Sequence, residues 1–533
     1  MPAEPDSKYT AISFAPVQGF IEKSRKLRDL YGASQILSYL SAKIVQRAGS
    51  TVISPVSSAG ESGLDLTQGM PNRILIEGKF SYNDAKSAIA EGWNEIIFGC
   101  RSWIEEHPQL SNEFTFSGEG WGRAWTKWKI NAWEIFWGEG ATIGKAMLTL
   151  ETNKLRRDWT VPNWNGESSS LSGADAIAYP SMDSKDNVGS KYNPGREREE
   201  IREFYDKLAK ALENTKQQDE PIFLDPSERL SIPELIKRLV THHQVARRID
   251  EQQSLYAKSF REMLRIKDKN QGEEGGYWTG WFMGDGDQVG KHLQGLGTAE
   301  EVRSFSRDLR TWGGKFHDDF NDKLKLGRVV YAGGDDFLGV MYGTLDHPQR
   351  EGAEVIQFLI DLGERWTKGN LRVNLSLGFV WAGHSVPQRD VLQHCREAEK
   401  CAKNLGRNRV TIRILFNNGQ FVQWTTPWQY MKWLKDYRDR NKQTGKDANW
   451  SHVYSDLAQL KARHAIPPKT AGHIDNPNED AVALSLLDLY FGDDKKEILS
   501  KHRKDITGLE STKSVIEWID GMIQVGWQLC SNS

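Results

Sequence analysis

The sequence predicts an α+β protein with two ferredoxin-like domains, one helical domain between them and another after them. Two observations predict this fold. The order strand, helix, two strands, helix occurs twice, starting near Thr10 and again near Tyr277, and it begins a βαββαβ unit. The stretches after each series carry mostly helical patterns. A chain of 533 residues also exceeds what a single hydrophobic core usually organises.

The first series predicts a ferredoxin-like domain over residues 1–165. In chain order it contains a strand at 10–14, a helix over 20–44, strands at 51–55 and 73–77, and a helix near 82–106. A cluster of tryptophans follows. Trp121, Trp125 and Trp128 recur at helical spacing, which favours a buried helix face over a platform that stacks bases.

The helical domain between the two series is predicted over residues 166–272. Its first part is rich in Ser, Gly, Pro and Asp, as in a linker or an insertion, and its second part is helical and charged. The second ferredoxin-like domain is predicted over residues 273–418 and the last helical domain over residues 419–533. Within the second domain we expect strands at 277–283, 372–381 and 409–415, a hairpin at 328–342, and helices over 299–323, 350–366 and 389–404.

Composition narrows the possible partners and the compartment. The net charge is −2, so a nucleic-acid partner would have to be held by local patches or through other subunits. The four cysteines are scattered, which favours a reducing compartment and argues against a disulfide framework or a zinc site built from cysteines. No apolar stretch reaches the roughly twenty residues that a membrane span needs. We therefore expect a cytoplasmic protein without a membrane partner.

The most informative motif is Gly333-Gly334-Asp335-Asp336, which lies between two apolar, strand-like runs. The glycines allow a tight turn, and adjacent carboxylates at a hairpin tip suit Mg²⁺ (or Mn²⁺), a hard cation that takes oxygen ligands. Earlier in the chain, Asp285 ends another strand-like run. In a ferredoxin-like unit the end of the first strand and the turn between the second and third lie on one sheet edge. We therefore expect the three carboxylates to meet there and to require a cation.

Such a site indicates an enzyme that acts on nucleoside triphosphates, because bound metal ions can stabilise an in-line phosphoryl displacement. Residues 284–291 lack the spacing of a P-loop, so we expect the turn at Gly286 to present backbone amides to phosphate. For Lys291, a phosphate contact and plain solvation both stay open. Each acidic motif alone is also an ordinary turn sequence. No setting for a nucleophilic serine or cysteine stands out, so we expect no nucleophilic catalysis.

Several segments, in order from near the start to about residue 415, together point to one family. They are residues 20–40 with the run Ser-Arg-Lys-Leu-Arg-Asp, residues 69–73, residues 228–238, the Asp-Gly-Asp and Gly-Gly-Asp-Asp pair, and residues 397–403. In these segments the sequence resembles the large, palm-containing subunit of type III CRISPR effector complexes, in its Cmr (III-B) branch.

The resemblance implies two palm domains in a complex that is loaded with guide RNA and senses target RNA. The other partners would be Cmr-type subunits, including the small helical subunit and the subunit that binds the repeat tag. The second palm would convert ATP into cyclic oligoadenylate, a messenger of antiviral defence, with Mg²⁺ assisting attack of one ATP 3′-hydroxyl on the α-phosphate of another. Lys403 matches a family lysine near the triphosphate. We therefore expect metal ligands at Asp285, Gly286, Asp335 and Asp336, and nucleotide contacts at Gly286, Asp287, Lys291, Gly333, Gly334 and Lys403.

Two departures from the family change what is expected. The palm signature begins near residue 10 with no HD-type nuclease domain before it, so we expect no DNA cleavage by such a domain. Residues 169–173 carry serine where relatives often have zinc-binding cysteines, so we expect no zinc. Two alternatives stay open: a catalytically silent scaffold in the same ribonucleoprotein, and a stand-alone cyclase of the GGDEF type. Against the cyclase, the fourth motif position is Asp336 rather than Glu.

Overall fold

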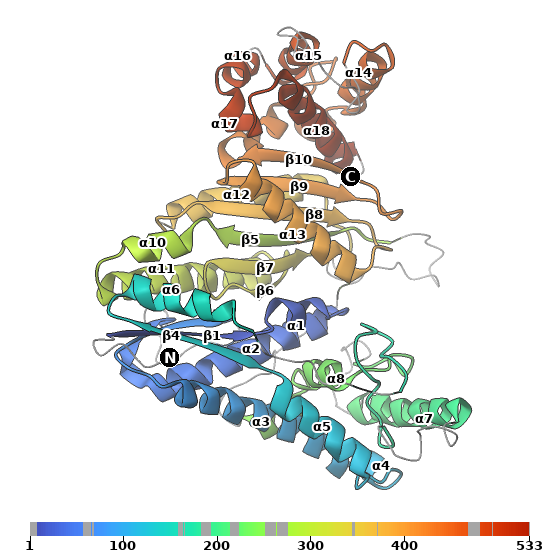
Figure 1. The fold of residues 1–533 in the computed structure, drawn as a ribbon. Helices are drawn as coiled ribbons and strands as arrows, with labels where there is room; N and C mark the ends of the chain where they lie inside the picture. Colours follow the sequence, from blue (N-terminus) through green and yellow to red (C-terminus); the bar gives the residue numbers. More distant parts are fainter. Residues whose placement is uncertain are drawn as a thin grey trace. The chain divides into compact units, whose positions relative to one another are not determined.

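The computed structural model describes residues 8–56, 66, 69–157, 164, 166–182, 193–213, 223–250, 263, 276–343, 347–369, 371–466, 480–492 and 494–531. By their contacts, the residues form two compact units (Figure 1). The first unit comprises Met1–Met263, Leu293–Gly314 and Val330–Gly334, and the second comprises Leu264–His292, Lys315–Val329 and Asp335–Ser533. The boundary predicted at residue 272 lies outside the described residues.

The first sheet has the strand order of a ferredoxin-like fold. Its strands are β1 (Tyr9–Ala15), β2 (Val52–Ser54), β3 (Arg73–Glu77) and β4 (Glu134–Gly140), in the order β2-β3-β1-β4. Every neighbouring pair is antiparallel. The predicted strands at 10–14, 51–55 and 73–77 are therefore present, and β4 completes the unit.

Both faces of this sheet are covered. Ile12 and Phe14 of β1 point into a large core that also includes the helices α2 (Leu27–Ala48) and α3 (Tyr82–Glu106). Ala11, on the opposite face of β1, belongs to a smaller core with α6 (Ile143–Lys154) and the start of α11 (Ala299–Asp318). This alternation is the period of two that a strand imposes on its side chains.

Further helices enlarge the first core. They are α1 (Gln18–Glu22), α4 (Pro108–Ser111), α5 (Glu119–Asn131), α7 (Pro194–Glu213), α8 (Ile232–Leu239) and α9 (His243–Ile249). Trp121 and Trp125 of α5 are buried and Trp128 packs against the same core, so the predicted buried tryptophan face is confirmed.

The helix predicted over residues 20–44 is wrong at one point, because it is divided into α1 and α2. Lys26 adopts an extended backbone and begins α2 anew. Asp29, in the first turn of α2, then pairs with the buried Arg238 of α8, with Nε–Oδ1 and Nη2–Oδ2 distances of 2.5 and 2.9 Å. Part of the Ser-Arg-Lys-Leu-Arg-Asp run therefore joins α2 to α8.

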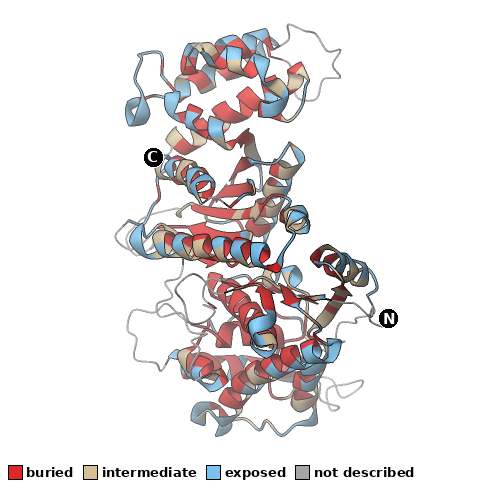
Figure 2. Ribbon diagram, turned by 90° about the vertical axis from the view of Figure 1, so that its left-hand side faces the viewer, coloured by how far each residue is buried: buried red, intermediate tan, exposed pale blue. Residues whose placement is uncertain are grey.

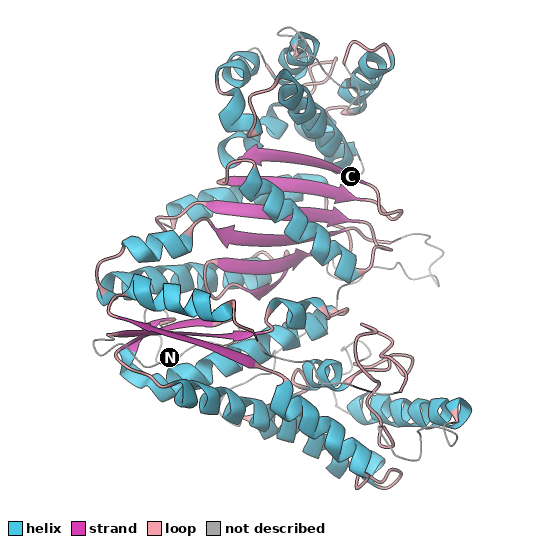
Figure 3. Ribbon diagram, viewed as in Figure 1, coloured by secondary structure: helices cyan, strands magenta, loops and turns pink. Residues whose placement is uncertain are grey.

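The second sheet repeats the ferredoxin-like order and extends it. Its strands are β5 (Thr279–Gly286), β6 (Gly327–Tyr331), β7 (Asp336–Met341), β8 (Leu375–Ala382), β9 (Arg409–Leu415) and β10 (Phe421–Pro427). Their order is β10-β9-β8-β5-β7-β6, in which β8-β5-β7-β6 matches β4-β1-β3-β2 of the first sheet (Figure 3). The helix α13 (Gln388–Asn404) connects the parallel pair β8 and β9. The predicted α+β class with two such sheets is confirmed.

The sequence did not predict β10, since helical structure was expected after about residue 420. This strand pairs along its whole length with β9 and buries Trp424. Its sequence, Phe-Val-Gln-Trp-Thr-Thr-Pro, mixes apolar and polar residues, as edge strands often do.

The remaining α-helices in the described residues, with one π-helix, lie around the second sheet or follow it in the sequence. They are α10 (Val289–Gly295), the one-turn π-helix Asp319–Lys323 that continues α11, α12 (Gly352–Lys368), α14 (Ser451–Ala462), α15 (Ala481–Phe491), α16 (Asp494–Lys501), α17 (Arg503–Thr507) and α18 (Thr512–Ser531). The strands of both sheets are mostly buried (Figure 2). Among the helices that the structure describes, none is long and apolar enough to cross a bilayer.

Candidate functional site

The end of β5 and the start of β7 bring the predicted acidic residues together. Asp285 of β5 is the register partner of Asp336, the first residue of β7. The amide of Gly286 donates a hydrogen bond of 2.8 Å to the carbonyl oxygen of Asp335. The backbones of the three aspartates therefore meet at one sheet edge, as the fold argument expected; their roles stay a prediction.

Two glycine–aromatic pairs fix this register. A Cβ atom on Gly284 would lie 2.2 Å from the ring of Phe337, and one on Gly339 would lie 2.2 Å from the ring of Phe282. Each glycine is the register partner of the phenylalanine that covers it. A slip of one residue would place these rings on the wrong face of the sheet. The same packing therefore holds Asp285 opposite Asp336.

The carboxyl group of Asp336 lies close to the carboxylates of Asp335 and Asp285. Desolvation by the surrounding atoms, followed by the charges of Asp335 and Asp285, raises the pKa of its carboxyl to about 7. The residue keeps an exposed surface, so water reaches the carboxyl and moderates this shift. A carboxyl that resists ionisation beside two other carboxylates is a position where a bound cation relieves repulsion.

Lys403 of α13 supplies a positive charge at the same edge. Its Nζ lies 2.6 Å from Oδ2 of Asp285, and it also pairs with Glu399. Burial alone would lower the pKa of Lys403, but its hydrogen bonds with Asp285 and Glu399 raise it above its usual value. The side chain of Asp285 is 33% exposed and that of Lys403 is 30% exposed, so this ion pair is open to exchange with an incoming cation or anion.

The close approach of α13 to the sheet positions Lys403. A Cβ atom on Gly378 of β8 would lie 2.3 Å from the carbonyl oxygen of Cys395 and 2.4 Å from the amide nitrogen of Glu399. Only glycine leaves room for the helix backbone at this distance from the strand. The helix therefore lies close enough for Lys403 to reach Asp285.

The donor chemistry of this edge fits Mg²⁺ or Mn²⁺, because carboxylate oxygens are the ligands these ions prefer. The arrangement is not yet that of a closed site. Within the described ranges, no three His, Cys, Asp or Glu side chains are grouped closely enough to hold a metal ion as they stand. Asp285 would have to exchange Lys403 for the metal before it could act as a ligand.

The carboxylate of Asp287, a predicted nucleotide contact, is engaged within the protein. Its carboxylate is buried and accepts hydrogen bonds from Ser376 Oγ (2.8 Å) and from the amide of Asn408 (2.9 Å). It thereby fastens the loop after α13 to the start of β8. A carboxylate used in this way holds the site together, and the predicted nucleotide contact at Asp287 stays a prediction.

A positively charged side chain that the sequence did not single out, Arg407, lies in the loop held by Asp287. The Nε atom of Arg407 is 3.9 Å from Oδ1 of Asp287, and its side chain is nearly half exposed. Arg407 and Asn408 both have positive φ angles, 63° and 49°, so a strained turn presents this side chain. Its place four residues after Lys403 was the signal available in the sequence.

The other predicted contacts differ in how open they are. Lys291 is exposed on α10, Gly286 is buried, and Gly334 is partly exposed. Gly333 is buried, and a Cβ atom on it would lie 2.1 Å from the carbonyl oxygen of Gly69. The side of Gly333 on which a side chain would stand therefore packs against backbone, and the predicted nucleotide contact at Gly333 stays a prediction.

The serines of residues 169–173 are engaged with a carboxylate. Ser169 Oγ and the amide of Ser172 donate to Oε1 of Glu234 at 3.2 and 3.0 Å. The expectation that this segment binds no zinc stays a prediction.

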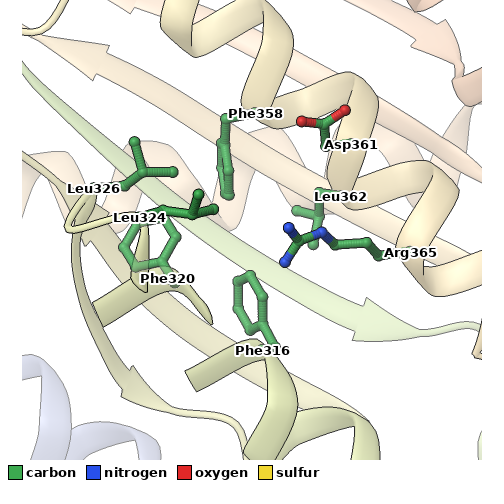
Figure 4. Close-up of a pocket in the computed structure, with 8 residues that line it drawn as sticks. All are labelled: Phe316, Phe320, Leu324, Leu326, Phe358, Asp361, Leu362 and Arg365. Atoms are coloured by element: carbon green, nitrogen blue, oxygen red, sulfur yellow. The ribbon is translucent and has the colours of Figure 1, made fainter. Parts of the chain in front are cut away.

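A separate apolar hollow lies in the second unit (Figure 4). Three phenylalanines and three leucines form most of its wall, with one acidic and one basic side chain on α12: Phe316, Phe320, Leu324, Leu326, Phe358, Asp361, Leu362 and Arg365. None of the predicted site residues lines it.

Two regions of the chain match known families. Residues 278–411 match the family described as Cas10/Cmr2, second palm domain, and residues 9–58 match the family described as CRISPR-associated protein Cmr2, N-terminal. The first of these regions contains the paired aspartates and Lys403. No curated protein matches the chain.

Solved structures resemble the fold over most of the chain. A type III-B Cmr-beta structure in the apo state has a TM-score of 0.55 at 11% identity, covering 98% of this chain and 82% of the other. A Csm1-Csm4 cassette in complex with cA4 has a TM-score of 0.46 at 14% identity, with coverage of 98% and 70%. Csm1 of T. onnurineus has a TM-score of 0.45 at 14% identity, with the same coverage. The first of these likenesses supports the fold and nothing beyond it.

Proposed function

Since the chain belongs to the Cas10/Cmr2 family by its two matched regions, we propose that it is the large subunit of a guide-RNA-loaded type III CRISPR complex and converts ATP to cyclic oligoadenylate when target RNA binds. One observation carries the catalytic part. Asp285 and Asp336 are register partners at the edge of the sheet within the matched palm domain, with Lys403 beside them.

In this proposal the aspartates bind metal and the basic residues bind phosphate. Asp285, Asp335 and Asp336 would hold Mg²⁺ or Mn²⁺, which when bound neutralises the triphosphate and favours attack on the α-phosphate. Lys403, once it leaves Asp285, is placed to bind phosphate, and Arg407 adds a second positive charge from the loop fastened by Asp287. A P–O bond would form between the 3′-oxygen of one ATP and the α-phosphorus of another, while the 3′-hydroxyl proton passes to water and the bond to pyrophosphate breaks. After repeated additions, the last 3′-oxygen would attack the α-phosphorus at the 5′ end of the same chain in the same way and close the ring.

The proposed partners are guide RNA, target RNA and the other Cmr-type subunits. The near-zero net charge supports a division of labour in which neighbouring subunits carry much of the RNA contact.

A catalytically silent scaffold in the same ribonucleoprotein is the second candidate. The ion pair between Lys403 and Asp285 favours it, because a lysine that occupied Asp285 permanently would exclude the metal. The two candidates differ in whether this pair opens when metal and nucleotide are present.

The test is a product assay on the chain assembled with its RNA-bound partners. ATP and Mg²⁺ are supplied with or without matching target RNA, and products are identified by mass. We expect cyclic oligoadenylate only with target RNA, and none from the double variant Asp335→Ala/Asp336→Ala. Asp361→Asn removes a carboxylate from the separate hollow. It is the matched control and should act like the wild type. Absence of product from an assembled wild-type complex would support the scaffold, and a cyclic dinucleotide from GTP would support a GGDEF-type cyclase.

A further inference from the structure

Arg310 of α11 joins the Gly-Gly-Asp-Asp turn to a loop of the N-terminal domain. We infer that Arg310 is a positioning residue: its guanidinium holds Gly333, at the start of the turn, against Gly69, so the acidic residues depend on the N-terminal domain. This inference rests on the proposed function of those acidic residues. Arg310, Gly69 and Gly333 all belong to the first compact unit.

The hydrogen bonds of Arg310 are the first evidence. Arg310 is only 1% exposed, and its Nη1 donates hydrogen bonds to the carbonyl oxygens of Gly69 (3.0 Å) and Gly333 (3.3 Å). A charged donor makes stronger hydrogen bonds than a neutral one. One guanidinium nitrogen thus links two backbone segments that are far apart in the sequence.

Three glycines show how closely these segments approach. A Cβ atom on Gly333 would lie 2.1 Å from the carbonyl oxygen of Gly69, and one on Gly313 of α11 would lie 2.0 Å from that of Ala332. Gly69 has a φ of +85°, and its Cβ would lie 2.6 Å from Cβ of Tyr331. There is no space for a side chain at any of these positions. The backbones of α11, of the loop that contains Gly69 and of the end of β6 are therefore in close contact, and a shift of one would require a shift of the others.

The Gly69 side of this contact is fixed to the N-terminal domain. Ser41 Oγ of α2 donates to the carbonyl oxygen of Pro71 (3.1 Å), and Asn72 Nδ2 donates to that of Phe14 in β1 (3.2 Å). The loop that contains Gly69 is thus held by the first sheet and by α2.

The turn is short, so the position of Gly333 constrains the positions of Asp335 and Asp336 through the covalent backbone. One residue, Gly334, separates Gly333 from Asp335, and the carbonyl oxygen of Asp335 accepts the hydrogen bond from Gly286 that closes the edge. A shift of Gly333 therefore changes where the carboxylates of Asp335 and Asp336 lie.

The test compares Arg310→Met and Arg310→Lys with Arg303→Met, which removes an ion pair from the same helix but leaves the two glycine carbonyls bonded. The readouts are the melting temperature and the affinity for Mn²⁺, measured by EPR on the full chain without RNA. We expect Arg310→Met to lose Mn²⁺ affinity on the order of tenfold, as when a residue that orients a metal ligand is removed. Arg310→Lys should recover part of it, because lysine keeps the charge but not the fork of donors.

A second pair of variants tests the contact without touching Arg310. Gly69→Ala strains a positive φ and brings Cβ onto Tyr331, whereas Gly78→Ala strains a similar φ of +93° with nothing within 4 Å. We expect both to lose stability but only Gly69→Ala to weaken Mn²⁺ binding.

Equal Mn²⁺ affinities in Arg310→Met and Arg303→Met, or in Gly69→Ala and Gly78→Ala, would overturn the inference and leave Arg310 a purely stabilising residue. The proposed function fails separately, through a wild-type complex that binds Mn²⁺ and yet makes no cyclic product.

Discussion

The ammonium group of Lys403 lies 2.6 Å from the carboxylate of Asp285. Asp285 is also the register partner of Asp336. In the proposed function, this ion pair places a lysine where the metal would bind. Metal binding at Asp285 would then free Lys403 for phosphate, so we expect metal and nucleotide to favour each other's binding.

Replacing Lys403 tests this expectation. In Lys403→Met, Asp285 loses its competing cation, so Mn²⁺ should bind more tightly without nucleotide, while ATP turnover by the assembled complex should fall by about a hundredfold. Calorimetry gives the first quantity and the product assay the second. Lys400→Met removes an exposed lysine from the same helix and should change neither. Unchanged Mn²⁺ affinity in Lys403→Met would show that the ion pair does not compete with metal.

The pKa of Asp336 predicts a pH-dependent stability without metal. A carboxyl whose pKa rises on folding binds more protons in the folded state, so its stabilising contribution is present at low pH and is lost as the pH rises through about 7. Asp336→Asn cannot ionise and should escape this loss. In EDTA, the melting temperature of the variant minus that of the wild type should therefore increase from about pH 5 to about pH 8. A difference that stays constant would mean that Asp336 ionises as an ordinary exposed carboxyl.

Gly378 controls the approach of α13. In Gly378→Ala the new Cβ would collide with backbone atoms of residues 395 and 399, which should cost about 1–3 kcal/mol of stability and move Lys403 away from Asp285. Urea unfolding measures the cost. Gly290→Ala, in α10 with nothing within 4 Å, serves as the control and should be neutral or slightly stabilising. A Gly378→Ala chain as stable as the control would mean that α13 can withdraw freely.

Asp287 is expected to act through structure. Asp287→Ala leaves Ser376 Oγ and the amide of Asn408 without their acceptor, so it should lower the free energy of unfolding by about 1–3 kcal/mol. Asp308→Ala, at an exposed position on α11, should have almost no effect. If Asp287→Ala instead kept full stability and raised only the KM for ATP, the nucleotide contact first predicted from the sequence would be correct.

The buried pair of Asp29 and Arg238 should contribute strongly to the first unit. Asp29→Ala removes the bidentate partner of a buried guanidinium, which keeps Glu228 as its remaining carboxylate, and should cost about 3 kcal/mol. The double variant Asp29→Ala/Arg238→Met should recover part of that loss. Denaturant unfolding of the wild type, Asp29→Ala, Arg238→Met and the double variant gives the coupling energy. Additive losses would show that the two side chains do not depend on each other.

The sequence predicted the elements with strong periodicity. The helix near 82–106 and the strand at 409–415 coincide with α3 and β9, and the meeting of β5 with the Gly-Gly-Asp-Asp turn followed from topology alone. It did not predict β10, whose mixed pattern reads as neither strand nor amphipathic helix.

Side-chain pairing at the site was beyond sequence reasoning. Lys403 reaches Asp285 because Gly378 lets α13 approach β8 closely. Asp287 turns inward because it accepts hydrogen bonds from Ser376 and Asn408, which are 89 and 121 residues away in the sequence. Such contacts arise from tertiary packing, which periodicity does not encode.

Binding of Mn²⁺ in the presence of a non-hydrolysable ATP analogue, followed by EPR, tests most directly whether the three aspartates form a metal site. We predict that the wild type binds Mn²⁺ with the analogue, that Asp285→Ala and Asp335→Ala/Asp336→Ala lose this binding, and that Asp361→Asn retains it. Mn²⁺ binding by the double variant that equals the wild type would contradict the account.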